Sequence, residues 1–234
     1  MLQDKHSLKI LVDGIELPVY HHQGRLYVEA ILGKSYEILL TAPIYNRYCA
    51  VLSVDGLSVM TGRRATLDDA GYIVGGSASN SAIKVPGFRL NDSEVARFVF
   101  GLPDQSYAAL MDSPANIGII GAVFYVERDN VRESGWGQGD STLRGGGLLG
   151  GSMTRGGAFG SGSRGHDRGT IFGDRLPNQV EHIPFHRGEV VARINIEYAS
   201  REALIKAGII SHSPLGEVSA FSEESGCRPP KGWR

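Results

Sequence analysis

Residues 52–59 read LSVDGLSV: an apolar run, an Asp-Gly pair and a second apolar run. Residues 10–17, ILVDGIEL, repeat the same pattern. Asp-Gly between two apolar segments is a strong signal for a β-hairpin, because a type I′ turn needs positive φ at both central positions. Both stretches therefore predict hairpins, and together they indicate a β-rich fold.

The segments around these hairpins show the patterns typical of strands. The longest apolar run is Ile117–Glu127, whose Val, Phe and Gly content favours a strand buried on both faces over a helix. Residues 190–198 alternate, so one face of that strand should carry Val190, Ala192, Ile194, Ile196 and Tyr198. The other expected strands are Arg25–Ala30, Ser35–Leu40, Tyr48–Val54, Tyr72–Val74, Ala82–Val85 and Val95–Phe100.

Helix is scarce in this sequence. Arg201–Ala207 is the one clear candidate, with Ser200 able to cap its start and Gly208 able to end it. Roughly ten short strands with turn signals between them predict an all-β fold, a β-sandwich of jelly-roll or immunoglobulin-like topology. The strand pattern suits both topologies, so the choice between them stays open.

A glycine-rich tract interrupts the strand pattern: residues 135–173 contain fifteen glycines among 39 residues. The strands before residue 130 need partners, and the strand at 190–198 can supply one. The tract is therefore predicted to be an insertion within one domain. The expected organisation is residues 1–133 as the first part of the sandwich, 134–173 as the insertion or arm, 174–216 as the completion of the sandwich with the short helix, and 217–234 as a C-terminal tail.

A nucleotide-binding role for the tract finds no support. Residues 160–165, GSGSRG, match the G-x-G-x-x-G pattern. That motif needs a strand entering the loop and a helix leaving it, so that the helix N-terminus meets the pyrophosphate. Neither element is expected here, and a glycine-rich tract produces such a match by chance. We therefore expect no cofactor.

Nucleic acid is an unlikely partner for similar reasons. The tract contains aromatic side chains for stacking, Trp136 and Phe159, and four arginines, Arg144, Arg155, Arg164 and Arg168. Arg-Gly segments can bind single strands through charge and stacking. However, the arginines follow no regular repeat, and the whole chain has a formal net charge of −1. A near-neutral chain lacks a global electrostatic attraction to nucleic acid.

The histidines and cysteines indicate no metal site. His182 and His186 are four residues apart, but Pro184 between them disfavours the helix that would align them as ligands. His21 and His22 lie in an expected turn. The only cysteines, Cys49 and Cys227, form neither a disulfide framework nor a metal cluster. We expect these histidines to be surface or interface residues.

Catalytic motifs are also missing, and the chain is predicted not to be an enzyme. The adjacent carboxylates Asp68-Asp69 and Glu223-Glu224 point to opposite sides in an extended chain, so neither pair forms an acid–base couple by itself. No G-x-S-x-G elbow occurs, and Cys49 has no histidine nearby in the sequence. An enzyme whose site is built from scattered loop residues stays open as an alternative.

The compartment is expected to be the cytoplasm, followed by incorporation into an assembly. The N-terminus lacks a basic segment followed by a long apolar run, so no signal peptide is expected. No stretch approaches about 18 consecutive apolar residues, so no membrane partner is expected either.

The tract itself is best explained as an arm that becomes ordered against a partner. Glycine loses more backbone entropy on ordering than any other residue, so such a segment cannot hold itself in place through its own core. Its apolar side chains would be the anchors on neighbouring subunits, with the last two fixing its return to the core: Trp136, Leu148, Leu149, Met153, Phe159, Ile171 and Phe172. A mobile solvated loop is the competing interpretation.

One resemblance supports the fold class. The segments concerned are VDGLSVMTG at 54–62, PGFR at 86–89, VARFVF at 95–100 and NIGIIGAVFY at 116–125. They resemble an uncharacterised group of bacterial and phage-type β-rich proteins, which share a V-D-G-L-x-V hairpin, a G-[FW]-R segment and an N-[IV]-G-x-I-G strand. The resemblance covers roughly residues 10–130 and 190–210. It implies a β-rich fold and no particular reaction.

These observations together predict a non-enzymatic structural protein of a large assembly. A minor capsid, decoration or connector protein of a phage or virus-like particle, docking through the glycine-rich arm and the C-terminal tail, fits best. Its partners would be other protein subunits of the assembly, with copies of itself as one option. The alternatives are a soluble β-sandwich that binds carbohydrate or protein through its loops, and the enzyme with a scattered site.

Overall fold

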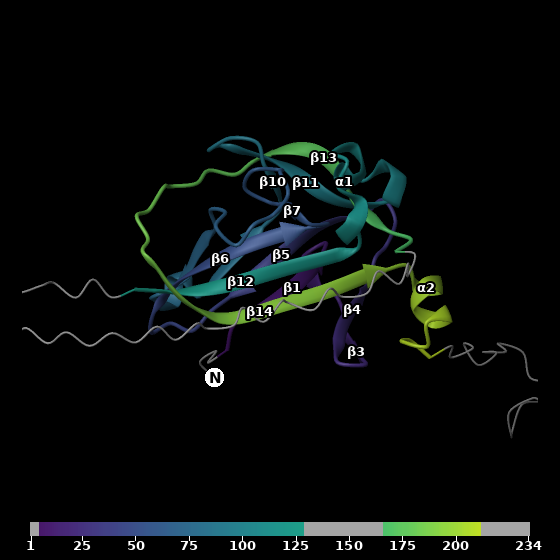
Figure 1. The fold of residues 1–234 in the computed structure, drawn as a ribbon, viewed down its shortest axis with the longest axis horizontal. Helices are drawn as coiled ribbons and strands as arrows, with labels where there is room; N and C mark the ends of the chain where they lie inside the picture. The colour runs from purple at the N-terminus through teal and green to yellow at the C-terminus, as the bar shows by residue number, and fades with distance from the viewer. Residues whose placement is uncertain (1–4, 129–165, 212–234) are drawn as a thin grey trace, which may run out of the picture.

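The computed structural model describes residues 5–128 and 166–211 of the 234-residue chain. In these residues strands are the main regular structure, and they form two sheets of seven strands each (Figure 1). Two short α-helices, α1 (Tyr107–Leu110) and α2 (Arg201–Lys206), lie toward the same end of the molecule in Figure 1. The prediction of an all-β fold is confirmed.

The first sheet is entirely antiparallel in the described part of the chain. Its strands follow the order β10 (Gly87–Arg89), β11 (Glu94–Gly101), β5 (Ser35–Thr41), β1 (Ser7–Val12) and β2 (Ile15–Glu16). Two further strands branch from this path: β13 (Gly169–Pro177) pairs with β11, and β9 (Ala82–Val85) pairs with β5.

The second sheet contains the longest strand pairing among the described residues, β14 with β12. Its order is β3 (Tyr20–His22), β4 (Arg25–Glu29), β14 (Arg187–Ala199), β12 (Ile119–Glu127), β6 (Arg47–Val54) and β7 (Leu57–Ser58), with β8 (Tyr72–Gly75) also on β6. The pair β14–β4 is parallel. The two strands are far apart in the sequence, so the chain between them provides the long connection that parallel pairing requires.

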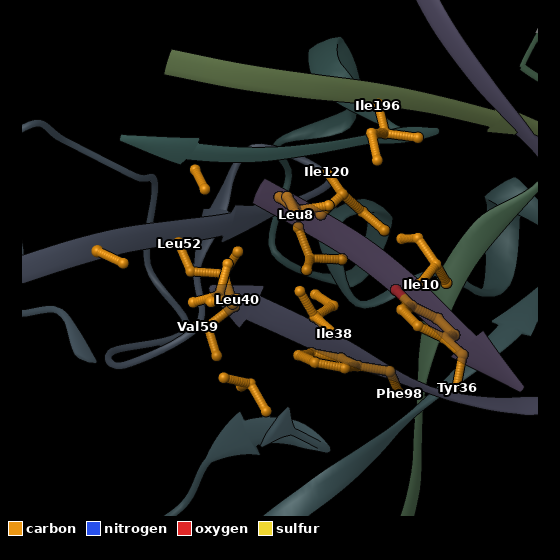
Figure 2. Packing of buried hydrophobic residues seen from close by; sticks show 14 of the residues in the cluster. Leu8, Ile10, Tyr36, Ile38, Leu40, Leu52, Val59, Phe98, Ile120 and Ile196 are labelled. Atoms are coloured by element: carbon orange, nitrogen blue, oxygen red, sulfur yellow. The ribbon is translucent and has the colours of Figure 1, made fainter. Parts of the chain in front are cut away.

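One hydrophobic core lies between the sheets, which makes the molecule a β-sandwich. The first sheet contributes Ile10, Ile38 and Leu40, and the second contributes Leu52 and Ile120 (Figure 2). These side chains are at most 1% exposed. Their alternation along each strand follows the period of two that the sequence shows.

Both Asp-Gly hairpins form as predicted. Asp13 and Gly14 join β1 to β2 with φ of 52° and 79°, and Asp55 and Gly56 join β6 to β7 with φ of 54° and 77°. Positive φ at both central positions is the requirement of the type I′ turn. The hairpin prediction is confirmed at both sites.

The C-terminal helix also forms as predicted. The Ser200 hydroxyl oxygen accepts a hydrogen bond from the Ala203 backbone N–H at 3.1 Å, and Gly208 has φ of 70° just after the helix. The helix α1, capped in the same way by Ser106, was not predicted, and it is one turn long. Three short 3-10 helices, at Ala78–Asn80, Pro103–Gln105 and Pro114–Asn116, were also missed.

Two details of the strand predictions were wrong. The core face of β12 is fully buried at Ile120 and Phe124, but the opposite face is only half-buried. In β14, a register shift against β12 places Ala192 opposite Phe124 and Val190 opposite Tyr125. Val190 therefore lies on the outer face, away from Ala192, because one extra residue in a strand reverses the alternation.

Strand β13 begins at Gly169, inside the range assigned to the glycine-rich insertion. Its glycines sit where neighbouring atoms leave no space for a side chain. A Cβ at Gly169 would lie 2.7 Å from Ser106 Cβ, and one at Gly173 would lie 2.7 Å from Val99 Cγ2. Composition alone favoured a loop here, whereas glycine in this strand permits close approach of neighbouring segments.

Candidate functional site at one end of the sandwich

The end that carries both helices contains the most unusual chemistry among the described residues. We call it the helical end; it comprises the turns after β1, β4, β6, β11 and β14 and the starts of β5, β12 and β13 (Figure 1). It combines a buried polar anchor, centred on Asp55, with a rim of exposed apolar side chains.

Asp55 lies in the β6–β7 turn and is 1% exposed. Its Oδ1 accepts hydrogen bonds from the Gly118 N–H at 2.9 Å and the Tyr198 hydroxyl at 2.6 Å. Its Oδ2 accepts from the Thr170 N–H at 2.7 Å. The carboxylate thus ties the hairpin to β13, to β14 and to the residue before β12. A buried charge is tolerated only when its hydrogen-bonding capacity is satisfied in this way.

The anchor continues as a chain of three buried hydroxyl groups. The Thr170 Oγ1 lies 2.7 Å from the Tyr198 hydroxyl and 2.7 Å from the Tyr36 hydroxyl. Because Tyr198 donates its only hydroxyl proton to Asp55, Thr170 must donate to Tyr198, and Tyr36 must donate to Thr170. All three hydroxyl groups therefore point their protons toward the carboxylate, and the chain links β5 of the first sheet to β14 of the second.

Burial raises the pKa of Asp55 from 3.8 to about 6, although its donors act in the opposite direction. Burial also raises the pKa of Tyr36 and of Tyr198 well above the ordinary value for tyrosine, with the nearby Asp55 charge as a second cause. Perturbed groups of this kind mark catalytic sites when a substrate can reach them. Here the carboxyl group is sealed inside the protein, so its geometry suits an anchor.

The anchor fixes the point at which the chain enters β13. Besides Thr170, the segment is held by Asp167, whose Oδ1 accepts from the Ser200 N–H at 3.0 Å. His166 packs so closely on Gly118 that a Cβ there would lie 2.6 Å from its Nδ1. Residues 166–170, within the C-terminal part of the glycine-rich tract, are therefore bonded to both sheets.

Above this anchor lies the apolar rim. Its six large hydrophobic side chains are between 39% and 73% exposed, and they are Ile15, Ile31, Leu32, Leu102, Leu110 and Met111. Exposed apolar residues also occur at the opposite end, Leu67, Leu90 and Ile183 among them. What makes the rim a candidate contact surface is therefore its position in turns that are bonded to one another.

The turns that carry the rim are tied to one another. Lys34 pairs with Asp13 at 3.1 Å, which joins the β4–β5 turn to the β1–β2 turn. The Gly33 N–H donates to the Phe100 carbonyl at 2.7 Å, next to Leu102. The rim is consequently presented by fixed turns, and a partner would meet it with little ordering cost.

The predicted arm residues divide into two groups. Ile171 and Phe172 lie in β13, where Ile171 pairs with Val99 of β11. Phe172 is 39% exposed, and its ring lies 4.1 Å from that of Tyr107 in α1. The remaining five lie outside the described residues, and they are Trp136, Leu148, Leu149, Met153 and Phe159. Contact of these residues with a partner stays a prediction.

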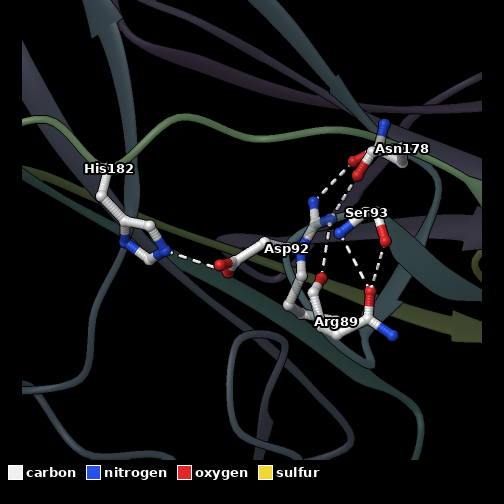
Figure 3. Close-up of polar contacts among 6 residues, drawn as sticks. Arg89, Asp92, Ser93, Asn178 and His182 are labelled. Atoms are coloured by element: carbon white, nitrogen blue, oxygen red, sulfur yellow. Dashed lines mark hydrogen bonds and ion pairs between the residues drawn. The ribbon is translucent and has the colours of Figure 1, made fainter.

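Of the histidines singled out from the sequence, His182 and His186 lie in the connection between β13 and β14. His21 and His22 lie in strand β3, so the prediction that they form a turn was wrong. His182 Nε2 lies 2.9 Å from Asp92 Oδ1, in the turn between β10 and β11 (Figure 3). Nearby, the Arg89 guanidinium donates hydrogen bonds to the backbone carbonyl of Asn178 at 2.6 Å and to its side-chain oxygen at 2.5 Å. These contacts hold the connecting segment against the sandwich.

Within residues 5–128 and 166–211, no group of three or more His, Cys, Asp or Glu side chains could hold a metal ion. No helix in the same residues is long and apolar enough to cross a membrane. Cys49 is buried in β6, as expected.

Comparison with protein-family models, with curated proteins and with solved structures finds no match to this chain. The function must therefore be argued from the residues themselves.

Sequence reasoning missed both parts of the helical end. Asp55 was recognised only as a turn residue, because its burial depends on Tyr198 and Thr170, which are distant in the sequence. The rim left a weak signal: the pairs Ile31-Leu32 and Leu110-Met111 are apolar pairs at the boundaries of elements.

Proposed function

We propose that this protein is a non-enzymatic structural component of a large assembly, which docks on neighbouring protein subunits through its helical end. A minor capsid, decoration or connector protein of a phage or virus-like particle is the specific form of this proposal. The observation that carries it is the apolar rim on fixed turns. The phage-type resemblance of the strand segments supports the specific form.

The anchor beneath the rim supports a mechanical role. Asp55 bonds segments from both sides of the sandwich, so force applied at the rim would be transmitted into both sheets. The chain leaves β12 at its far end and returns at residue 166 beside Gly118, at the start of β12. With about 3.3 Å per residue in a strand, these two points are roughly 30 Å apart. An arm starting and ending there has attachment points along the length of the sandwich.

The test is site-specific photo-crosslinking of the full chain in the cells that produce it. A photoreactive amino acid replaces Leu110 in the rim or, as the matched control, Leu90 at the opposite end; these side chains are 73% and 41% exposed. We expect position 110 to give one discrete product with a protein subunit, either a second copy or another chain. Position 90 should give none.

A second variant keeps the result interpretable. Leu32→Glu in the rim should abolish the product from position 110, because a charge in an apolar contact costs binding energy. Leu67→Glu at the opposite end should leave the product intact. Equal products from positions 110 and 90, or no product from either, would contradict docking through the helical end.

A further inference from the structure

A polar groove lies on the outer face of the second sheet, beside the helical end. It has a volume of about 850 Å³ and is bounded by the start of β4 on one side and by the loops containing Arg64 and Asn116 on the other. Its size lies within the range of ligand-binding sites. It belongs to neither the apolar rim nor the buried anchor.

The floor of the groove is a row of three small or polar residues across three strands. Ser53 of β6 and Asn195 of β14 both lie opposite Gly121 of β12. A Cβ at Gly121 would lie 2.9 Å from Asn195 Oδ1 and 3.1 Å from Ser53 Oγ. The Asn195 amide and the Ser53 hydroxyl therefore occupy the space that a side chain at position 121 would fill, and they form the polar surface of the floor.

The walls of the groove carry more positive than negative charge. Arg25 is paired with Glu197 at 2.8 Å. Arg64 and Arg193 are exposed, and among the described residues neither guanidinium has a hydrogen-bond or ion-pair partner. Two guanidinium groups are thus available to carboxylates, with which they form charge-assisted, bidentate hydrogen bonds.

We infer that this groove binds an extended acidic peptide segment of a partner protein. The side-chain amides of Asn116 and Asn195 both line the groove. Each can donate and accept hydrogen bonds, as a peptide backbone requires. Arg64 and Arg193 would receive two acidic side chains of the segment, and its backbone would lie over the Asn195 and Ser53 side chains of the floor.

A nucleic acid fits the same groove less well. Among the described residues, no aromatic side chain lines it for base stacking, which supplies much of the affinity for single strands. The lack of a stacking surface favours the peptide.

The experiment measures binding of fluorescein-labelled probes to the full chain by fluorescence anisotropy at low salt. The probes are an eight-residue peptide of alternating Glu and Ser, its Lys–Ser counterpart and an oligothymidylate. We expect the Glu–Ser peptide to bind most tightly, with affinity falling as salt is raised. The double variant Arg64→Glu/Arg193→Glu should weaken it by about tenfold or more, because opposed charges become like charges.

A matched control distinguishes binding in the groove from general electrostatic attraction to the protein. Arg63→Glu changes the neighbouring arginine, which is exposed but does not line the groove, and it should alter affinity less than about threefold. Gly121→Ala adds one methyl group to the floor. It should weaken binding of the peptide without changing the net charge. The fold should be preserved, because the Asn195 side chain can move aside.

Three results would overturn the inference. One is equal weakening by Arg63→Glu and by the groove double variant. Another is tighter binding of the oligothymidylate, lost in the double variant, which would assign the groove to nucleic acid. The third is tighter peptide binding after the tail residues Glu217, Glu223 and Glu224 are changed to Gln, which would identify the chain's own tail as the occupant.

Discussion

The two Asp-Gly hairpins have nearly the same local sequence and the same turn geometry, yet their aspartates do different things. Asp13 and Asp55 have φ of 52° and 54°, and the glycines that follow have φ of 79° and 77°. The Asp13 side chain is 65% exposed and pairs with Lys34. Asp55 is buried and receives three hydrogen bonds from distant segments.

The comparison separates what a turn requires from what a fold adds. Aspartate tolerates the left-handed conformation, and this explains its presence in both turns. Only Asp55 faces the space between the sheets, where Tyr198, Thr170 and Gly118 converge. Aspartate thus meets the local requirement of the turn in both hairpins, and in the second hairpin it is also the centre of a buried hydrogen-bond network.

The largest expected difference concerns loss of the two carboxylates. Asp55→Ala should lower the free energy of unfolding by about 4 kcal/mol, because three buried donors lose their acceptor at about 1–3 kcal/mol each, with partial relaxation. Asp13→Ala should cost about 1 kcal/mol, since an exposed ion pair contributes little and the turn strain is small. Urea unfolding followed by circular dichroism measures both. Similar losses in the two variants would mean that the Asp55 network does not stabilise the fold.

The next effect is a pH dependence specific to Asp55. Its folded-state pKa of about 6 lies above the ordinary aspartate value of 3.8, so between these two pH values the folded state holds a proton that the unfolded state has released. Stability from this group is therefore present below about pH 4 and is lost as pH rises to about 6, by roughly 3 kcal/mol.

The variant Asp55→Asn isolates the pH-dependent contribution of Asp55 to stability, because the amide does not titrate. As pH rises from about 4 to 7, the unfolding free energy of the wild-type protein should fall relative to that of Asp55→Asn. The amide places an N–H₂ group opposite the Thr170 or Gly118 N–H, so a constant loss will accompany the pH-dependent part. A difference that is constant over this range would show that Asp55 titrates normally.

The smallest effect concerns the glycines of the two turns. A Cβ at Gly56 would lie 2.9 Å from Asn116 Cβ, whereas nothing lies within 4 Å of one at Gly14. Both have positive φ, so Gly14→Ala should cost about 1 kcal/mol from backbone strain alone. Gly56→Ala should cost about 2 kcal/mol because Asn116 must also move. Thermal unfolding of the two variants side by side tests this, and equal shifts would indicate that Asn116 adapts freely.

Much of the fold could be predicted from the sequence, since each predicted strand and both hairpins depend on local patterns. Tyr48–Val54, for example, is an apolar run next to an Asp-Gly pair, and β6 covers these residues. Strand β13 was missed because its glycines, at the first and the middle position, hide its pattern. Val190 was placed on the wrong face because a register shift leaves no mark in the alternation.

The candidate site could be predicted far less well. Thr170 and Tyr198 carry no motif, and they become functional neighbours of Asp55 only through pairings with residues more than 110 positions away. The arginines of the groove, Arg64 and Arg193, are likewise brought to one sheet face from separate parts of the chain.

By itself, then, the sequence determined the elements: alternation set which residues form strands, and Asp-Gly set where two of them turn back, because these depend on steric limits within a few residues. Tertiary structure decided the rest. It buried one aspartate and left the other in water, gathered the apolar rim at one end, and opened the groove above Gly121. Burial and electrostatics depend on which distant segments pack together, and no local pattern records that.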